Sequence, residues 1–251
     1  MRNGEIWFNG KPASEYGVRH IEAYPEMNRP ERKADIFEVP GRSGSVVFMQ
    51  DAWNEIEKQY EIYAGDGERG SVPKELYKLS FWLNFADGYG RLEDTYEPEI
   101  FRLAYCLGAY ETETAFNRPG RATLTFNCRP EHFLKTGAVF DLFDTYTGAV
   151  RNPTPYTAKP LFRLYKETGA DDTTLTVTSG GKTYEIDIDI PSSYGWLYID
   201  CETMHAYGTN GVDCNSMISC DEFPQLAGNE TATISASSGY QVSIMPRWFY
   251  I

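Results

Sequence analysis

The sequence predicts a mostly β protein with one helix, of the α+β class, and two observations carry this prediction. Tyr, Thr, Val, Ile and Phe recur in short alternating stretches that Gly, Asn and Pro interrupt. One segment has apolar residues at helical spacing, since Val72, Leu76, Leu79 and Leu83 form a single stripe. A chain of 251 residues has room for one or two domains. The segment Asn127-Cys128-Arg129-Pro130 is typical of the end of a unit.

We therefore expect two domains, over residues 1–133 and 134–251. In the first, residues 6–8 form a strand that enters a tight turn at Asn9-Gly10, because Asn-Gly accepts positive φ at both central positions. Residues 35–39 and 46–49 flank a Gly-rich tip and predict a long hairpin. Residues 56–64, 100–107 and 121–128 are further strands. The helix is capped by Ser71 and has Pro73 in its first turn.

The second domain is predicted to be all β, most simply a sandwich. Residues 161–166 and 196–201 are strands. Residues 173–178 alternate Thr with Leu and Val and turn at Gly180-Gly181. The return strand alternates Glu185, Asp187 and Asp189 with isoleucines, which predicts a half-buried antiparallel hairpin with an acidic, wet face. Residues 231–236 and 241–245 are expected to form a last hairpin around Ser238-Gly239.

Charge and composition exclude several classes of protein. The chain carries 23 basic and 36 acidic side chains, for a net charge of -13. This argues against a nucleic-acid binder or a polybasic membrane-surface protein, both of which depend on Lys and Arg. No apolar run is long enough to span a membrane, and no signal segment precedes the first strand. Five cysteines without an export signal indicate reduced thiols.

Two patterns invite a chemical interpretation. Residues 65–70 fit G-x-G-x-x-G, but Asp66 and Glu68 would face a bound pyrophosphate, so we interpret the segment as a turn into the helix. Zinc is conceivable at four residues that lack a C-x2-C knuckle, and buried free thiols are the favoured interpretation. These residues are Cys201, His205, Cys214 and Cys220.

No enzyme signature is present. His20, His132 and His205 are far apart, and G-x-S-x-G is absent. The acidic row is interpreted as a solvated strand face, since calcium loops place their oxygens around a turn. We therefore predict no catalytic residue, metal or cofactor. The alternative function is a carbohydrate-binding β-sandwich protein, in which Trp196, Trp248 and tyrosines would stack on sugars from one concave face.

The order of local patterns resembles the distal tail (Dit) proteins of long-tailed, siphovirus-type phages and prophages. The resemblance covers essentially the whole chain. Thr154 departs from it, because the family usually has Gly there, which leaves the shape of that turn open. The matching segments are Phe8-Asn9-Gly10-Lys11, residues 14–18, Val39-Pro40-Gly41-Arg42-Ser43-Gly44, Tyr105, Phe126-Asn127-Cys128-Arg129-Pro130, Asn152-Pro153, Pro160-Leu161-Phe162, Ile199-Asp200-Cys201-Glu202 with Met204, Phe223-Pro224-Gln225-Leu226, Gly228-Asn229 and Ile244-Met245-Pro246-Arg247-Trp248.

This resemblance implies a structural tail-tip (baseplate hub) protein without catalysis. It implies a hexameric ring that joins the tail tube protein to tip and receptor-binding proteins. The N-terminal domain would be tail-tube-like and the C-terminal one a galectin-like β-sandwich facing outward, without the large carbohydrate-binding insertions of some members. DNA would pass through the ring without specific binding. The net negative charge of the chain would make the channel wall repel the duplex. The protein would be made in the host bacterial cytoplasm and reside at the virion tail tip, with no membrane insertion.

Candidate interface residues follow from the ring. A cyclic assembly above two-fold symmetry needs two different faces that match. We place one face on the N-terminal hairpin and strands, and the other around the helix at residues 71–85, on its outer side. The apolar C-terminal residues 246–251 should be docked, either on the chain's own sandwich or on the N-terminal domain, because free termini fray. The candidates are Pro40, Gly41, Arg42, Ser43 and Gly44 at the tip, Lys74, Tyr77 and Lys78 on the helix, and Arg247, Trp248 and Phe249 at the terminus.

Overall fold

The structure is a computed structural model that describes residues 4–22, 29–64, 72–84, 88–107, 120–143, 146–167, 169–191 and 194–251. Its contacts divide the chain into two units: Met1–His132 with Ile251, and Phe133–Tyr250. Each unit has its own hydrophobic core. The predicted class is confirmed, since strands dominate and α1 is the one α-helix among the described residues. No helix in these ranges has the length and apolarity needed to cross a bilayer.

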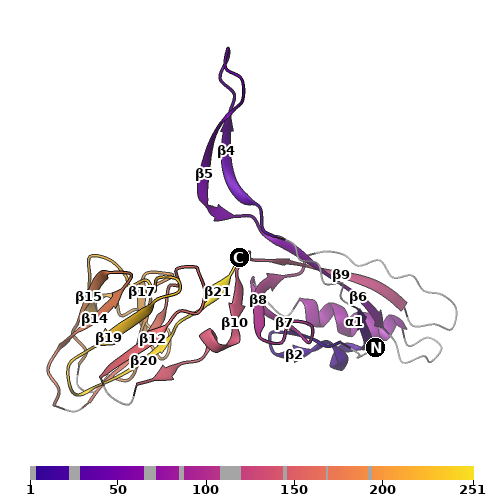
Figure 1. Ribbon diagram of the computed structural model, residues 1–251. Helices are drawn as coiled ribbons and strands as arrows, with labels where there is room; N and C mark the ends of the chain where they lie inside the picture. The colour runs from indigo at the N-terminus through magenta and orange to yellow at the C-terminus, as the bar shows by residue number, and fades with distance from the viewer. Residues whose placement is uncertain are drawn as a thin grey trace. The chain divides into compact units, whose positions relative to one another are not determined.

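The first unit is built on one antiparallel sheet with the strand order β2-β1-β7-β8-β9-β6-β3. The long hairpin of β4 and β5 forms a two-stranded sheet of its own (Figure 1). The elements are β1 (Ile6–Phe8), β2 (Lys11–Pro12), η1 (Ala13–Tyr16), β3 (Val18–Glu22), β4 (Arg32–Phe37), β5 (Val46–Trp53), β6 (Ile56–Ala64), α1 (Val72–Leu83), β7 (Gly90–Asp94), β8 (Ile100–Tyr105) and β9 (Gly120–Cys128).

The Asn9-Gly10 turn is confirmed in detail. Both residues have positive φ, 52° and 74°, as a two-residue hairpin loop requires. The strands pair on either side of it, Phe8 with Lys11. The Asn9 side chain also accepts a hydrogen bond from the Arg91 amide at 2.9 Å, which ties the turn to β7.

Helix α1 packs its apolar stripe onto the sheet. Leu79 and Trp82 are fully buried, and Trp82 makes edge-on contacts with Phe8 at 6.1 Å and with Phe126 at 6.4 Å. The Trp82 indole N–H donates to the Lys11 carbonyl at 3.0 Å. One large side chain therefore joins the helix to strands from the beginning and the end of the unit. The predicted cap, Ser71, lies outside the described residues.

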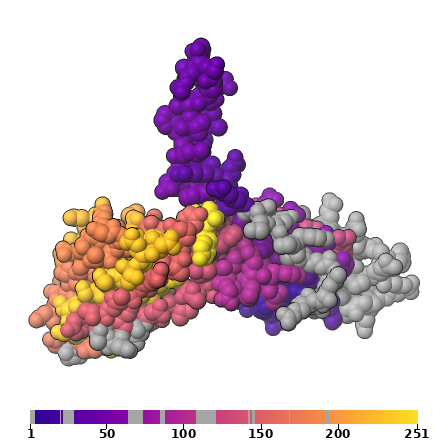
Figure 2. All heavy atoms as spheres, in the orientation of Figure 1, coloured from indigo at the N-terminus to yellow at the C-terminus, as the bar shows by residue number. Residues whose placement is uncertain are grey.

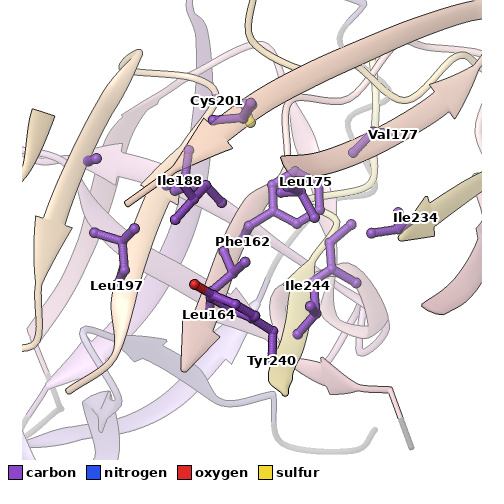
Figure 3. Packing of buried hydrophobic residues seen from close by; sticks show 14 of the residues in the cluster. Phe162, Leu164, Leu175, Val177, Ile188, Leu197, Cys201, Ile234, Tyr240 and Ile244 are labelled. Carbon is purple, nitrogen blue, oxygen red and sulfur yellow. The ribbon is translucent and has the colours of Figure 1, made fainter. Parts of the chain in front are cut away.

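The second unit has two five-stranded sheets, in the orders β11-β20-β13-β16-β17 and β12-β19-β14-β15-β18. One core cluster takes residues from both sheets, as in a β-sandwich (Figure 3). Its elements are β10 (His132–Leu134), η2 (Lys135–Ala138), β11 (Asp141–Leu142), β12 (Thr147–Arg151), β13 (Leu161–Lys166), β14 (Thr173–Ser179), β15 (Lys182–Ile188), β16 (Leu197–Asp200), β17 (His205–Gly208), η3 (Asn215–Met217), β18 (Ile218–Ser219), β19 (Thr231–Ser235), β20 (Tyr240–Met245) and β21 (Phe249–Tyr250).

The Thr-rich hairpin forms as predicted. β14 and β15 pair along their length, and Gly180 and Gly181 turn the chain with φ of 61° and 73°. The three acidic residues of the return segment are exposed, whereas the isoleucines between them are buried.

The predicted last hairpin is wrong. β19 pairs with β12 and β14, whereas β20 pairs with β11 and β13. The segment around Ser238-Gly239 therefore crosses from one sheet to the other. The strands were predictable because alternation is local, but the choice of sheet depends on partners far away in sequence.

The Asn-Pro turn does not need glycine at position 154. Asn152 is buried, and its side-chain amide donates to the carbonyls of Tyr156 at 2.8 Å and Leu226 at 3.2 Å. Its side-chain oxygen accepts hydrogen bonds from the amide and hydroxyl of Thr154, both at 2.9 Å. Thr154 is not among the residues with positive φ. The threonine hydroxyl thus adds a bond that glycine lacks.

Candidate functional site

We call β4, β5 and the connecting residues 38–45 the arm. All five predicted tip residues, Pro40 to Gly44, are exposed. Gly41 and Gly44 both have φ of 81°, a left-handed conformation that favours glycine. The Arg42 amide donates to the Val39 carbonyl at 3.1 Å and closes the turn. The tip is therefore a tight, solvated turn with a guanidinium at its end.

The stem of the arm is the stronger candidate surface, although the residues singled out from the sequence were those of the tip. Ile36, Phe37, Phe48 and Met49 are each 55–65% exposed. Figure 2 shows the arm as a narrow column of atoms. A lone two-stranded hairpin is at best marginally stable in water, and clustered exposed apolar side chains mark interaction sites. The available signal was the unbroken apolar run of residues 46–49, which is typical of strands buried on both faces.

The outer side of α1 is the second candidate surface. Lys74, Tyr77 and Lys78 are exposed as predicted, with Tyr77 at 78%. Phe81, one turn beyond Tyr77, is 61% exposed. The Lys78 ammonium pairs with Glu75 at 2.9 Å. This surface is apolar at its centre and basic at its edge, and within one copy neither it nor the arm covers the other.

The third set of predicted residues lies at the C-terminal segment, which is docked in the second unit. Trp248 is 5% exposed and belongs to the sandwich core. Its carbonyl accepts a hydrogen bond from the Leu134 amide at 2.8 Å. Phe249 packs against Phe133 and stacks on Tyr156, with ring centroids 6.1 and 5.6 Å away.

Arg247 fixes this segment by charge. Its two terminal nitrogens donate to the two carboxylate oxygens of Asp200 at 2.7 and 2.8 Å. Burial opposes ionisation of Asp200, but the hydrogen bonds and charge of Arg247 hold the pKa of that carboxyl below its usual value. The Arg247 amide donates to the Gly137 carbonyl at 2.7 Å. A Cβ on Gly137 would lie 2.4 Å from the Trp248 nitrogen, so glycine is required for this approach.

The aromatic residues on the outer face of one sheet do not form a sugar platform. Tyr198 and Tyr207 stack on each other, with ring centroids 5.3 Å apart and planes 3° apart. The Arg163 guanidinium lies over Trp196 at 4.3 Å and over Phe140 at 4.5 Å. These ring faces are occupied by neighbours of the same unit, so the predicted carbohydrate alternative gains no support from them.

Two of the four residues considered for zinc have other partners. Cys214 lies 2.8 Å from the Tyr194 hydroxyl, and the His205 Nδ1 lies 3.0 Å from the Asn215 amide nitrogen. Burial raises the pKa of the Cys201 thiol well above its usual value. Within the described ranges, no group of three or more His, Cys, Asp or Glu is placed to hold a metal ion. The G-x-G-x-x-G segment, residues 65–70, lies outside those ranges.

A buried charge network lies at one end of the first core. Asp94 is 3% exposed; it accepts a hydrogen bond from the Tyr60 hydroxyl at 2.6 Å and pairs with Lys58 at 3.1 Å. Arg102 pairs with Glu97 at 2.7 Å. Burial opposes ionisation of Asp94, but Lys58 and Tyr60 hold its pKa below the usual value. Asp94 and Arg102, the two most buried charges of this network, thus each have a partner of opposite charge.

The two units define a class of fold: an antiparallel sheet with one helix and a long hairpin, followed by a β-sandwich. No protein-family model and no curated protein matches the sequence. The fold is that of the Dit protein of phage SPP1, described as a paradigm of the hub adsorption apparatus of phages that infect Gram-positive bacteria. The match has a TM-score of 0.73 and 16% identity and covers 99% of both chains.

Two structures of the phage P2 baseplate, in its activated conformation with Ca and with Sr, each contain a similar chain. Each match has a TM-score of 0.57 and 10% identity and covers 97% of both chains. The resemblance found in the sequence is thus confirmed at the level of the fold.

Proposed function

We propose that this chain is a structural subunit of the tail tip of a long-tailed phage. Six copies form a ring that joins the tail tube to tip and receptor-binding proteins. The observation that carries the proposal is the match over 99% of both chains to SPP1 Dit, which takes in both units. In this role the protein works by shape and contact, and its place is the virion tail tip after synthesis in the host cytoplasm.

The described surfaces support self-assembly. A ring above two-fold symmetry uses two unlike faces that match each other. The arm offers an apolar ribbon with Arg42 at its tip, and α1 offers Tyr77 and Phe81 flanked by lysines. In the second unit, the candidate docking residues Arg247, Trp248 and Phe249 are held by residues of that same unit. We therefore assign ring closure to the first unit and contacts with other tail proteins to the second.

The test is the mass of the purified protein. Light scattering over a range of concentrations should give six times the 28.5 kDa of one chain, and negative-stain images should show rings. Deletion of residues 41–44 should weaken assembly while circular dichroism shows a folded monomer. A strict monomer at every concentration, without rings on isolated tails or in images, would contradict the proposal.

A further inference from the structure

One sheet of the second unit has an outward face that is aromatic around a single cation. The register places Arg163 of β13 beside Tyr198 of β16, which in turn lies beside Tyr207 of β17. The residues that alternate with these three belong to the buried core, so the row points away from it. Further half-buried rings adjoin the row. We call the whole set the aromatic face; it consists of Phe140, Arg163, Tyr165, Trp196, Tyr198 and Tyr207.

Arg163 has no counter-charge within the described ranges. Its guanidinium lies over the Trp196 ring at 4.3 Å and over the Phe140 ring at 4.5 Å. A terminal nitrogen donates a long hydrogen bond of 3.4 Å to the Ser243 hydroxyl, and the buried Nε has no hydrogen-bond partner. No other Lys or Arg points outward from β13, β16, β17 or β20. Ring faces are therefore the main compensation for this half-buried positive charge.

This arrangement is unusual in a chain with 36 acidic and 23 basic side chains. Four cations elsewhere have side chains that are 6–20% exposed, and each of them pairs with a carboxylate. Removing a charge from water is costly unless such a partner is present. A guanidinium without one is suited to pair with a carboxylate from another molecule. The four internal pairs are Lys58 with Asp94, Arg102 with Glu97, Lys166 with Asp172 and Arg247 with Asp200.

The composition of the aromatic face favours a protein as that molecule. Tyr, Trp and Arg are the residues that dominate binding energy at protein interfaces. A small anion would reach Arg163 but leave the rings in water. Tyr198 and Tyr207 already stack face to face, so they offer ring edges, against which apolar side chains can pack. The planar guanidinium has the geometry to hold both oxygens of one carboxylate.

We propose that the aromatic face is the docking site for another tail-tip protein, which inserts one Asp or Glu side chain, flanked by apolar residues, to pair with Arg163. This inference rests on the proposed function and deepens it, because it assigns a partner contact to a defined surface of the second unit. Arg163 selects the partner: it accepts a carboxylate and repels a cation at the same position.

Photo-crosslinking in isolated tails identifies the occupant of the aromatic face. Benzoylphenylalanine replaces Tyr207, and mass spectrometry locates the linked peptide. The link should run to a different tail protein, in a segment with an Asp or Glu close to the linked residue. Replacement of Tyr184, which lies on β15 of the other sheet, is the matched control and should not give that product. A link only to another copy of this chain, a linked segment without a carboxylate, or no link in assembled tails would overturn the inference and leave the ring intact.

Charge reversal tests the role of Arg163. Arg163→Glu should still form rings of the native mass, but the partner's affinity should fall about ten-fold or more. Changing the crosslinked partner carboxylate to Lys should recover most of the affinity in the double variant. Arg151→Glu, an exposed charge reversal on β12 of the other sheet, is the matched control and should bind normally. If Arg163→Glu forms no rings, Arg163→Gln removes the charge without reversing it and should show a similar loss.

The outcomes separate this inference from the proposed function. Normal partner binding by rings of Arg163→Glu or Arg163→Gln would overturn the inference, as would equal losses in the single and double variants. An equal loss in Arg151→Glu would also overturn it, because the effect would then follow net charge. An unmodified chain that forms no ring and enters no tail would overturn the inference and the proposed function together.

Discussion

Arg247 has a backbone conformation that few bulky residues adopt, with φ of 61°. It keeps this conformation because its guanidinium is held at both ends by Asp200 and its amide by Gly137. A third acceptor, a Glu202 oxygen, lies 3.5 Å away. The strained residue is thus the anchor that sets Trp248 into the core.

Arg247→Ala should lower the free energy of unfolding by about 2–4 kcal/mol, since Asp200 is left buried without its partner. Chemical denaturation of the purified protein measures this. Lys182→Ala is the matched control: it breaks an exposed pair with Glu222 and should change stability by less than about 0.5 kcal/mol. Equal effects of the two substitutions would show that the Asp200 pair is no anchor.

His132 should make the protein sensitive to mild acid. Burial, together with the nearby Arg102 and Lys58 cations, lowers the pKa of His132 from 6.5 to about 4. Between pH 6.5 and about 4, His132 is protonated in the unfolded chain but neutral in the folded one. The free energy of unfolding that is present above pH 6.5 is therefore lost as the pH falls toward 4. With its partial exposure allowed for, the loss is roughly 2 kcal/mol.

At lower pH, protonation of Asp94 and Glu97 destabilises the folded protein further, because ion pairs keep the pKa values of these carboxyls below the usual ones. Their contribution is present above the unfolded values and disappears as the pH falls through the folded ones. Melting temperatures from pH 8 to 4 should fall in the native protein and fall less steeply in His132→Gln. Parallel curves for the two proteins would exclude His132 as the cause.

At the scale of elements, the C-terminal segment after β20 acts as a latch on the sandwich. Truncation after Met245 removes Arg247, Trp248 and Phe249 together. Burial of the tryptophan and the ion pair sum to roughly 4 kcal/mol, which corresponds to a melting temperature about 10 °C lower or to insoluble protein. Truncation after Phe249 keeps all three residues and should melt near the native temperature. A fully stable short form would mean that the segment serves partners instead.

Local patterns could predict most elements but not their partners. The Asn9-Gly10 turn, the α1 stripe and the Thr-rich hairpin each depend on residues close in sequence, and each formed as expected. β19 and β20 also alternate correctly, yet their sheets are chosen by strands more distant in the chain. In the arm, the apolar run at residues 46–49 is typical of a strand buried on both faces, but these residues are exposed or half-buried in a single copy. The sequence therefore indicated the hairpin as a face of the ring, but the residues singled out were those of its tip and not those of its stem.

For the whole molecule, the net charge of -13 predicts weak or no affinity for duplex DNA. Six such copies around a channel would repel the duplex, because few contacts would release counterions from phosphate. We expect no binding of duplex DNA to the assembled protein in fluorescence anisotropy at low salt. Binding that weakens steeply as salt rises would reveal a basic lining and contradict the acidic channel.

The crossing between β19 and β20 has a consequence for synthesis on the ribosome. β13 lies between β16 and β20, so its hydrogen bonding on one side waits until residues 240–245 have left the exit tunnel. The first unit pairs its own strands earlier, and domains generally fold in the order in which they are made. Nascent chains would then have a folded arm while the β-sandwich of the second unit still lacks β20. On a polysome such chains would bring the arm of one copy close to α1 of another, and we expect assembly to begin before translation ends.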